Sequence, residues 1–270
     1  MNIGGIEKLT LIDFPGEIAA IVFTQACNFR CQFCYNPMLV LSASERNWPK
    51  GLGKDYIKKD HSLIPESDLF SFLKSRIGKI SGVVITGGEP TLQSDLPEFI
   101  GKIKEMGFKV KLDTNGTIPE MIKMLIGNQE IGRLGKKDQE ISNSQIPKFP
   151  NSQIIDYLAM DIKAPLDKYE DVVGVKVDKE KIKKSIKLIM ESGIPYEFRT
   201  TLVPGLHTKD DIAKVGELIK GADKWFLQFF KSDTELINKD FEGKNKFTSK
   251  EMEEMKKIAE KYVERVEIRG

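Results

Sequence analysis

The sequence predicts an α/β fold in which helices surround a parallel sheet as a partial (β/α)6 TIM-type barrel. Short apolar runs recur along the 270-residue chain, as expected for strands that are buried on both faces of a parallel sheet. Most of these runs are followed by a longer segment with apolar residues three or four positions apart, the period of a helix that covers a sheet. Polar residues follow the ends of the apolar runs, where such folds build their sites.

Composition limits the class of protein. Hydrophobic residues make up 40% of the chain and charged residues 30%, which is ordinary for a globular protein. The 42 basic and 40 acidic side chains leave a net charge of +2, so charge gives no case for a nucleic-acid or membrane partner. No apolar run approaches the roughly 20 residues of a membrane span. The start lacks a secretory signal and the three cysteines are clustered, so we expect a reducing, cytoplasmic location.

The chain begins with extended segments that lead into a cysteine-rich loop. Residues 9–12 and 18–24 are rich in β-forming side chains. Between them, Pro15-Gly16 predicts a type II turn, because proline fixes one φ and glycine accepts a positive φ at the next position. Residues 1–17 are therefore expected to form an N-terminal extended segment. The run at 18–24 is predicted to be a central strand, and the cysteines lie just past its end.

Strands and helices alternate along the rest of the chain. Further strands are predicted at residues 82–86, 108–112, 157–160, 195–202 and 224–230, with a short last one at 266–268. Helices are predicted at 38–41, from a Ser67 cap to Ile77, at 96–106 and 119–125, from an Asp178 cap to Gly193, at 210–219, and from a capping box of Thr248 and Glu251. The helix after Ser67 is expected to bury Ile77.

Six main strands, mostly followed by helices, indicate a parallel sheet with right-handed crossovers. A full eight-unit barrel takes about 250 residues, and part of this chain forms loops, so an incomplete barrel fits better. A doubly wound open sheet remains an alternative, because counting strands does not give their order. In either architecture one rim collects the polar residues at the strand ends, namely the cysteines, Glu89, Asp113, Asn115, Asp161, Lys163 and Gln228.

Residues 127–153 depart from this alternation. They are rich in glycine, lysine, serine and asparagine, and Asn-Ser-Gln-Ile occurs at 143–146 and again at 151–154. This composition predicts a flexible surface insert. Residues 46–59 are likewise expected to form a surface loop. Neither segment suggests a separate core, so residues 1–270 are expected to form a single domain.

The three cysteines, Cys27, Cys31 and Cys34, are spaced C-x3-C-x2-C and can direct three thiolates at one metal centre. A structural zinc site takes four ligands, so it would need a histidine, His61 or His207, as the fourth. A [4Fe–4S] cube has four irons, and three cysteines would leave one iron open to a small molecule. Neither histidine lies near a second metal-like cluster, so zinc is the less favoured of the two.

Each of the other motifs on the rim, taken alone, is weaker evidence for a binding site than the cysteines are. Gly87-Gly88-Glu89 after a strand is most often a simple turn, although it also lets a ligand approach the backbone and offers a carboxylate to an ammonium group. Asp113, Asp161 and Lys163 are as well explained by an ion pair as by a binding site. Only their position on one rim makes a site the better interpretation.

Taken together, these motifs resemble the radical S-adenosylmethionine (SAM) superfamily. Its C-x3-C-x-aromatic-C pattern is matched at residues 27–34, with Phe33 as the aromatic residue, and its Gly-Gly-Glu motif at residues 87–89. Residues 11–16, 23–31, 113–116 and 160–163 resemble the glycyl-radical-enzyme activases, and most of all those of anaerobic ribonucleoside-triphosphate reductase. Pyruvate formate-lyase activating enzyme is another relative. Tyr35 departs from the many relatives with histidine after the last cysteine.

The resemblance implies cofactors and roles for residues. The three cysteines would hold a [4Fe–4S] cluster as electron source, and SAM would bind its fourth iron. The Gly87-Gly88 backbone and Glu89 would receive the SAM amino group, and the backbone at Phe33 would lie by the adenine. Ribose or carboxylate contacts are implied for Asn115, Lys163 and Arg199, and a monovalent cation site for Asp113, Thr114 and Asp161.

The implied activity is reductive cleavage of SAM to a 5′-deoxyadenosyl radical, which installs a glycyl radical on a partner enzyme. The implied partners are a glycyl radical enzyme, with anaerobic ribonucleoside-triphosphate reductase favoured, and an electron donor such as flavodoxin or ferredoxin. Alternatives are a pyruvate formate-lyase type target, a small-molecule enzyme of the 7-carboxy-7-deazaguanine synthase type, and a non-catalytic zinc-binding module.

Overall fold

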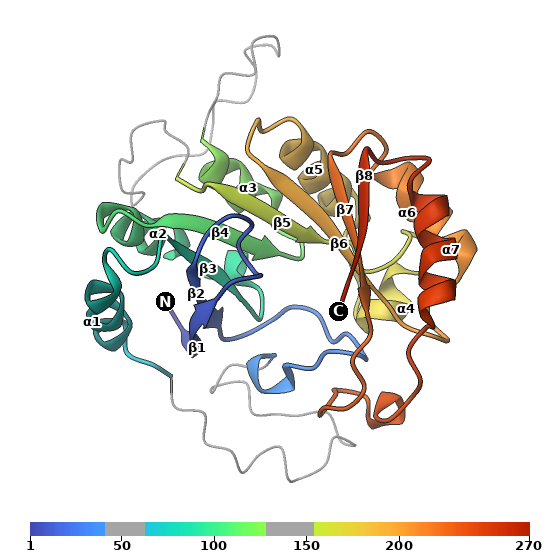
Figure 1. The fold of residues 1–270 in the computed structure, drawn as a ribbon, viewed down its shortest axis with the longest axis horizontal. Coiled ribbons are helices and arrows are strands. Elements are labelled where there is room, and N and C mark those ends of the chain that lie inside the picture. Colours follow the sequence, from blue (N-terminus) through green and yellow to red (C-terminus); the bar gives the residue numbers. More distant parts are fainter. Residues whose placement is uncertain (41–62, 128–153) are drawn as a thin grey trace.

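The computed structural model describes residues 1–40, 63–127 and 154–270, and their strands form one sheet with eight members (Figure 1). The strands are β1 (Ile3–Thr10), β2 (Ala19–Thr24), β3 (Gly82–Gly87), β4 (Lys109–Thr114), β5 (Tyr157–Asp161), β6 (Tyr196–Leu202), β7 (Lys224–Phe229) and β8 (Arg265–Arg269). β1 is antiparallel to β2, and every later pair is parallel.

The order of the strands decides the architecture. Each strand pairs with its neighbour in sequence, from β1 at one edge to β8 at the other. A doubly wound sheet would reverse this order at a switch point, so that alternative is excluded. In the described part of the chain β8 does not pair with β1, and the curved sheet therefore stays open as a partial barrel. The predicted α/β fold class is confirmed, and the predicted short last strand is present as β8.

Helices lie around the outside of the curved sheet, with α2 against β4, α7 against β7 and β8, and α6 beside α7 (Figure 1). The helices are α1 (Glu66–Arg76), α2 (Leu96–Glu105), α3 (Pro119–Ile126), α4 (Tyr169–Val173), α5 (Lys179–Met190), α6 (Lys209–Leu218) and α7 (Ser249–Ala259), with short 3-10 turns at Pro37–Leu39, Pro90–Leu92 and Lys239–Phe241. The predicted Asp178 cap and the Thr248–Glu251 capping box are both present.

Both faces of the central strands are buried. Along β2, Ala20 and Val22 pack into the large core between the sheet and the helices, whereas Ala19 and Ile21 face a smaller inner cluster with Phe14. Successive side chains of a strand point to opposite faces, so a strand covered on both sides must be apolar throughout. This explains why the run at 18–24 has no polar alternation.

The connection between β1 and β2 contributes the side chain of Phe14 to the inner cluster. Glu17 N donates to Phe14 O at 3.1 Å, and Gly16 has φ +80°, which together form the predicted turn with proline at its second position. Phe14 is 3% exposed and meets Tyr157 edge-on, with ring centroids 6.1 Å apart. The turn therefore places a buried aromatic side chain in the inner cluster of the sheet.

Several predicted boundaries are wrong. The first strand is Ile3–Thr10 rather than 9–12, because pairing with β2 decides its extent, and Ile12 is 81% exposed. Helix α1 is preceded by Pro65 rather than capped by Ser67. Ile77 lies after the helix end and is 53% exposed rather than buried. Helix α4 is too short to show a helical period and was not predicted.

Some predictions fall on residues 41–62 and 128–153, which lie outside the described residues. They include the surface loop at 46–59, His61, the end of the helix at 38–41, and nearly all of the insert at 127–153. Within the described ranges, none of the helices combines the length and apolar character needed to cross a bilayer.

Candidate active site

The cysteine loop leaves the end of β2 through a strained residue. Ala26 has φ +79°, a left-handed conformation that is rare for any residue but glycine. Its N–H donates to Leu39 O at 2.8 Å, and the N–H of Cys27 donates to Val40 O at 3.0 Å. These bonds join the two ends of the loop, so the surrounding structure holds the strained residue beside the first cysteine.

All three cysteines line one cavity of about 290 Å³, near the lower end of the roughly 300–1,000 Å³ range of ligand pockets. The cavity is also lined by each of the other residues predicted from the sequence, namely Phe33, Gly87, Gly88, Glu89, Asp113, Thr114, Asn115, Asp161, Lys163 and Arg199, and by Tyr35 and Gln228. The rim that the strand ends predicted is therefore one continuous pocket.

Burial controls the chemistry of the thiols. It raises the pKa of Cys27 and of Cys31 to about 12, and it also raises the pKa of Cys34. The unliganded thiols are thus protonated at neutral pH, and binding of a metal centre must release their protons. Cys34 N donates to Cys31 O at 3.0 Å, which keeps the second half of the loop tightly turned.

The donor set fits a cube better than a single ion. Among the described residues, no group of three histidine, cysteine or acidic side chains is placed to hold one metal ion. His207 is no free ligand, because Nδ1 accepts from Val203 N at 3.1 Å and Nε2 lies 2.8 Å from Lys163 O. A cube gives each thiolate a different iron, so three thiols around one cavity suit it without a fourth ligand.

The Gly-Gly-Glu turn packs directly against the start of the cysteine loop. A Cβ atom on Gly88 would lie 1.9 Å from Ala26 O, and one on Gly87 would lie 2.4 Å from Thr24 N. Gly88 N donates to Thr24 O at 2.8 Å, and Glu89 N donates to Ala26 O at 2.8 Å. The two glycines are therefore needed for close approach of two backbone segments, whatever else they bind.

Glu89 is buried, at 1% exposure, and protein donors reach both of its carboxylate oxygens. Oε1 accepts from the N–H and hydroxyl of Thr91 and from the Thr114 hydroxyl at 2.7 Å, and Oε2 accepts from Asn115 N at 2.7 Å. Burial raises the pKa of Glu89 above its usual value in spite of these hydrogen bonds. The expected contact between this carboxylate and a SAM amino group has to share oxygens that are already bonded.

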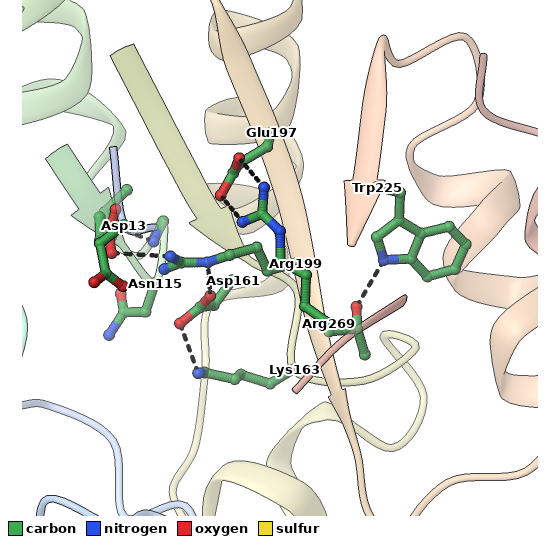
Figure 2. A network of polar contacts seen from close by, with 12 residues as sticks. Asp13, Asn115, Asp161, Lys163, Glu197, Arg199, Trp225 and Arg269 are labelled. Atoms are coloured by element: carbon green, nitrogen blue, oxygen red, sulfur yellow. Dashed lines mark hydrogen bonds and ion pairs between the residues drawn. The ribbon is translucent and has the colours of Figure 1, made fainter. Parts of the chain in front are cut away.

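The opposite side of the cavity is ionic. Arg199 of β6 lies between two carboxylates. Its Nε lies 2.8 Å from Asp161 Oδ1 (Figure 2), and its Nη1 lies 2.9 Å from Asp113 Oδ2. Lys163 Nζ donates to Asp161 Oδ2 at 2.9 Å. Lys111 Nζ lies 3.0 Å from Asp113 Oδ1. Three cations thus contact two carboxylates on this wall.

These ion pairs set the charge of the wall. Burial alone would raise the pKa values of Asp113 and Asp161, but Arg199 and the lysines more than offset it and lower both pKa values below 3.8. The carboxylates are therefore ionised at neutral pH. Lys111 also lies 3.8 Å from the buried carboxylate of Glu197, so the cations of this wall are matched by carboxylates, and Asp113 and Asp161 both already have cationic partners.

Several polar residues of the site were missed by the sequence analysis. Asn28 and Thr117 hydrogen-bond to Asn115, and Lys111 is 1% exposed in the middle of β4. Lys111 had a detectable signal, because it lies two positions before Asp113 and so faces the same side of its strand. Asn28 and Thr117 had none beyond their closeness to predicted residues in the chain.

The chain is similar to proteins of one known superfamily. The sequence profile of the Radical SAM superfamily matches residues 21–134. A Methanocaldococcus jannaschii protein provisionally named a glycyl-radical enzyme activating enzyme is 32% identical over 99% of this chain and 95% of its own length. The pyruvate formate-lyase-activating enzyme of Streptococcus mutans is 28% identical over 81% of this chain and 72% of its own.

A solved structure supports the fold. SuiB of Streptococcus suis bound to S-adenosylmethionine aligns with a TM-score of 0.60 at 15% identity, over 91% of this chain and 48% of SuiB. This chain therefore spans about half of SuiB, and the likeness concerns the fold alone. By its full-length relative, the chain belongs to the glycyl-radical enzyme activating enzymes of the radical SAM superfamily, enzymes whose cofactors are a [4Fe–4S] cluster and S-adenosylmethionine.

Proposed function

We propose that this enzyme activates anaerobic ribonucleoside-triphosphate reductase by installing a glycyl radical on it. As a glycyl-radical enzyme activating enzyme, the chain acts on a glycyl radical enzyme as partner. The particular target rests on the resemblance of residues 11–16, 23–31, 113–116 and 160–163 to the activases of that reductase. An electron donor of the flavodoxin or ferredoxin kind would supply the reducing electron.

One observation carries the proposal: the three thiols, the Gly-Gly turn and the ion-paired Lys163 and Arg199 all line the same cavity. When bound, the cluster and SAM supply one electron and a 5′-deoxyadenosyl radical, with methionine as the other product, and the radical takes a hydrogen atom from a glycine Cα of the partner. The chain itself would have to hold SAM in place and keep water away from the radical. The buried lining of the cavity suits both tasks.

The walls of the cavity suggest how SAM is held. We expect Cys27, Cys31 and Cys34 to hold the cluster, and the cations Lys163 and Arg199, which line the cavity, to attract the SAM carboxylate. The Gly87-Gly88 backbone would face the amino group, and the backbone at Phe33 the adenine.

Two further assignments are constrained by the structure. Asn115 Oδ1 already accepts from the N–H and hydroxyl of Thr117, at 3.0 and 2.7 Å, so a ribose hydroxyl would be served mainly by the Asn115 amide hydrogens. The monovalent cation expected at Asp113, Thr114 and Asp161 remains a prediction, and the ion pairs of both carboxylates weigh against it.

The test is the radical itself. The reconstituted protein is incubated anaerobically with SAM, a reductant and the ribonucleoside-triphosphate reductase of the same source, and the EPR spectrum is recorded. A glycyl-radical doublet that is absent with the Cys31→Ala variant supports the proposal. SAM cleavage to 5′-deoxyadenosine without any doublet on this reductase would contradict the assigned target.

The pyruvate formate-lyase type of partner is the second candidate, because the Streptococcus mutans relative bears that name. The same incubation with a pyruvate formate-lyase in place of the reductase separates the two. A doublet on the lyase alone would favour this alternative. A doublet on the reductase alone would favour the proposal.

A further inference from the structure

The Gly-Gly-Glu turn is linked by hydrogen bonds to both chain neighbours of Cys27, directly on one side and through Asn115 on the other. On the N-terminal side, Glu89 N donates to Ala26 O, the residue just before the cysteine. On the C-terminal side, the Glu89 carboxylate accepts from Asn115 N at 2.7 Å, and Asn115 Nδ2 donates to Oδ1 of Asn28, the residue just after the cysteine, at 2.8 Å. One buried glutamate thus reaches both chain neighbours of the first cysteine.

The contact on the C-terminal side is a closed ring of hydrogen bonds among Asn28, Thr117 and Asn115. Asn115 Nδ2 donates to Asn28 Oδ1, Asn28 Nδ2 donates to the Thr117 hydroxyl at 2.8 Å, and that hydroxyl donates to Asn115 Oδ1 at 2.7 Å. Each side chain both donates and accepts, so the ring fixes the orientation of both amides. Removal of one member leaves polar groups without partners in a partly buried place.

The geometry points to this ring, which we call the Asn28–Thr117–Asn115 ring, as the group of side chains that positions Cys27. Glu89, which accepts a hydrogen bond from Asn115 N, supports the ring. By positioning Cys27, the ring and Glu89 also position the bound cluster and SAM. On this view Glu89 is a positioning residue that acts through Asn115, and the SAM amino group is received by the backbone of the turn. The inference rests on the proposed role of the three cysteines as cluster ligands. It does not depend on which partner receives the radical.

The physical reason lies in the strained backbone beside the cysteine. Ala26 keeps φ +79° only because its neighbours hold it, and the cysteine that follows can move if either side is released. Groups that orient a metal ligand, without touching the metal, typically change metal affinity or activity by about 10- to 100-fold when they are removed. A small displacement of Cys27 would move a bound cluster relative to Lys163 and Arg199, which we expect to hold the SAM carboxylate.

The test uses the full-length chain, reconstituted with iron and sulfide under anaerobic conditions. Thr117→Val keeps the size of the side chain and removes the hydroxyl that closes the ring. Thr117→Ser keeps the hydroxyl and removes only a methyl group. We expect Thr117→Val to bind SAM about 10-fold or more weakly than the wild type and to change the EPR spectrum of the reduced, SAM-bound cluster. Thr117→Ser should have the SAM affinity and the EPR spectrum of the wild type.

Two results would overturn the inference. One is wild-type SAM affinity and an unchanged spectrum for Thr117→Val. The other is an equal loss in the valine and serine variants, because the methyl group rather than the hydroxyl would then matter. If circular dichroism shows that Thr117→Val does not fold, Asn28→Ala, which opens the same ring from a half-buried position, is measured in its place with the same criteria.

A double variant tests the part played by Glu89. If Glu89 works through the ring, Glu89→Gln combined with Thr117→Val should bind SAM no more weakly than the weaker of the two single variants. Losses that multiply would show that Glu89 acts separately, as a direct ligand of SAM would, and would overturn its positioning role. No partner enzyme is present in these measurements, so an absent glycyl radical leaves them valid. A wild-type chain that binds no cluster would instead contradict the proposed function.

Discussion

The two walls of the cavity are built by different forces. The wall from β2, β3 and the cysteine loop is held by backbone hydrogen bonds and by contacts too close for a Cβ atom, with neutral thiols on its surface. The wall from β4, β5 and β6 is held by ion pairs among Asp113, Asp161, Lys163 and Arg199 (Figure 2). One wall depends on shape and the other on charge.

This difference predicts how each wall fails. Backbone packing has no tolerance for added atoms and is insensitive to pH near neutrality. Buried ion pairs tolerate small shifts, but they fail when one partner is removed, because the remaining charge is left unpaired. Substitutions of similar size should therefore act through different mechanisms on the two sides of the site.

The largest effect is expected for Gly88→Ala. Its Cβ would lie 1.9 Å from Ala26 O, so either the turn or the cysteine loop must move. We expect a loss of more than about 3 kcal/mol in the free energy of unfolding and failure to incorporate iron. Denaturant unfolding of the apoprotein and iron analysis after reconstitution measure these two quantities.

Gly5→Ala is the matched control. Gly5 also lies beside a neighbouring strand, but its Cβ would meet nothing closer than 3.6 Å, an ordinary contact. We expect a change of no more than about 1 kcal/mol and normal iron content. Equal losses in the two variants would show that the turn at Gly88 is no tighter than the rest of the sheet.

The next largest effect is expected for Arg199→Met. The substitution keeps most of the side-chain volume and removes the charge between Asp113 and Asp161, leaving each carboxylate with one lysine. We expect a loss of about 3 kcal/mol in the free energy of unfolding. Lys214→Met, which breaks an exposed ion pair with Asp167, should cause no measurable change. Similar losses in both would mean that burial adds nothing to the ionic wall.

The difference between wild type and Arg199→Met should also shrink in acid. The folded-state pKa values of Asp113 and Asp161 are lowered, so their stabilisation is present above the unfolded-state value of 3.8 and is lost as pH falls through the folded-state values. The Arg199→Met variant lacks the part of this stabilisation that Arg199 supplies, at every pH. Unfolding of both proteins from pH 7 to about pH 2 should therefore give a constant gap down to about the unfolded-state value of 3.8 and converging curves below it, and a gap that stays constant below that value would contradict the ionic origin of the loss.

The smallest effect is expected in the reactivity of the thiols on the neutral wall. Burial raises the pKa of Cys27 and Cys31 to about 12, so few thiolates exist in the folded apoprotein at pH 8. Iodoacetamide should alkylate these cysteines at least about tenfold more slowly in the folded apoprotein than in urea. Mass spectrometry of timed samples measures the rates. Equal rates in the two states would show that the cavity does not protect its thiols.

How far the sequence predicts this protein differs from element to element. The type II turn at Pro15-Gly16, the Asp178 cap and the final capping box were predictable, because each depends on residues a few positions apart. The extent of β1 and the exposure of Ile77 were not, since partners elsewhere in the chain decide them. The rim residues were predicted to share one site because parallel strands end on one side of a sheet.

The barrel-like alternation, the cysteine spacing and the family could be predicted from the chain alone, because each is a local pattern. The strand order and the partners of each rim residue depend on how distant segments pack together. Asn28 meets Asn115 across 87 positions, and Arg199 meets Asp113 across 86. Such pairs form when the barrel brings distant strand ends together, and no local pattern records which donor will face which acceptor. The positions of the site residues could thus be predicted from the chain, whereas their contacts required the fold.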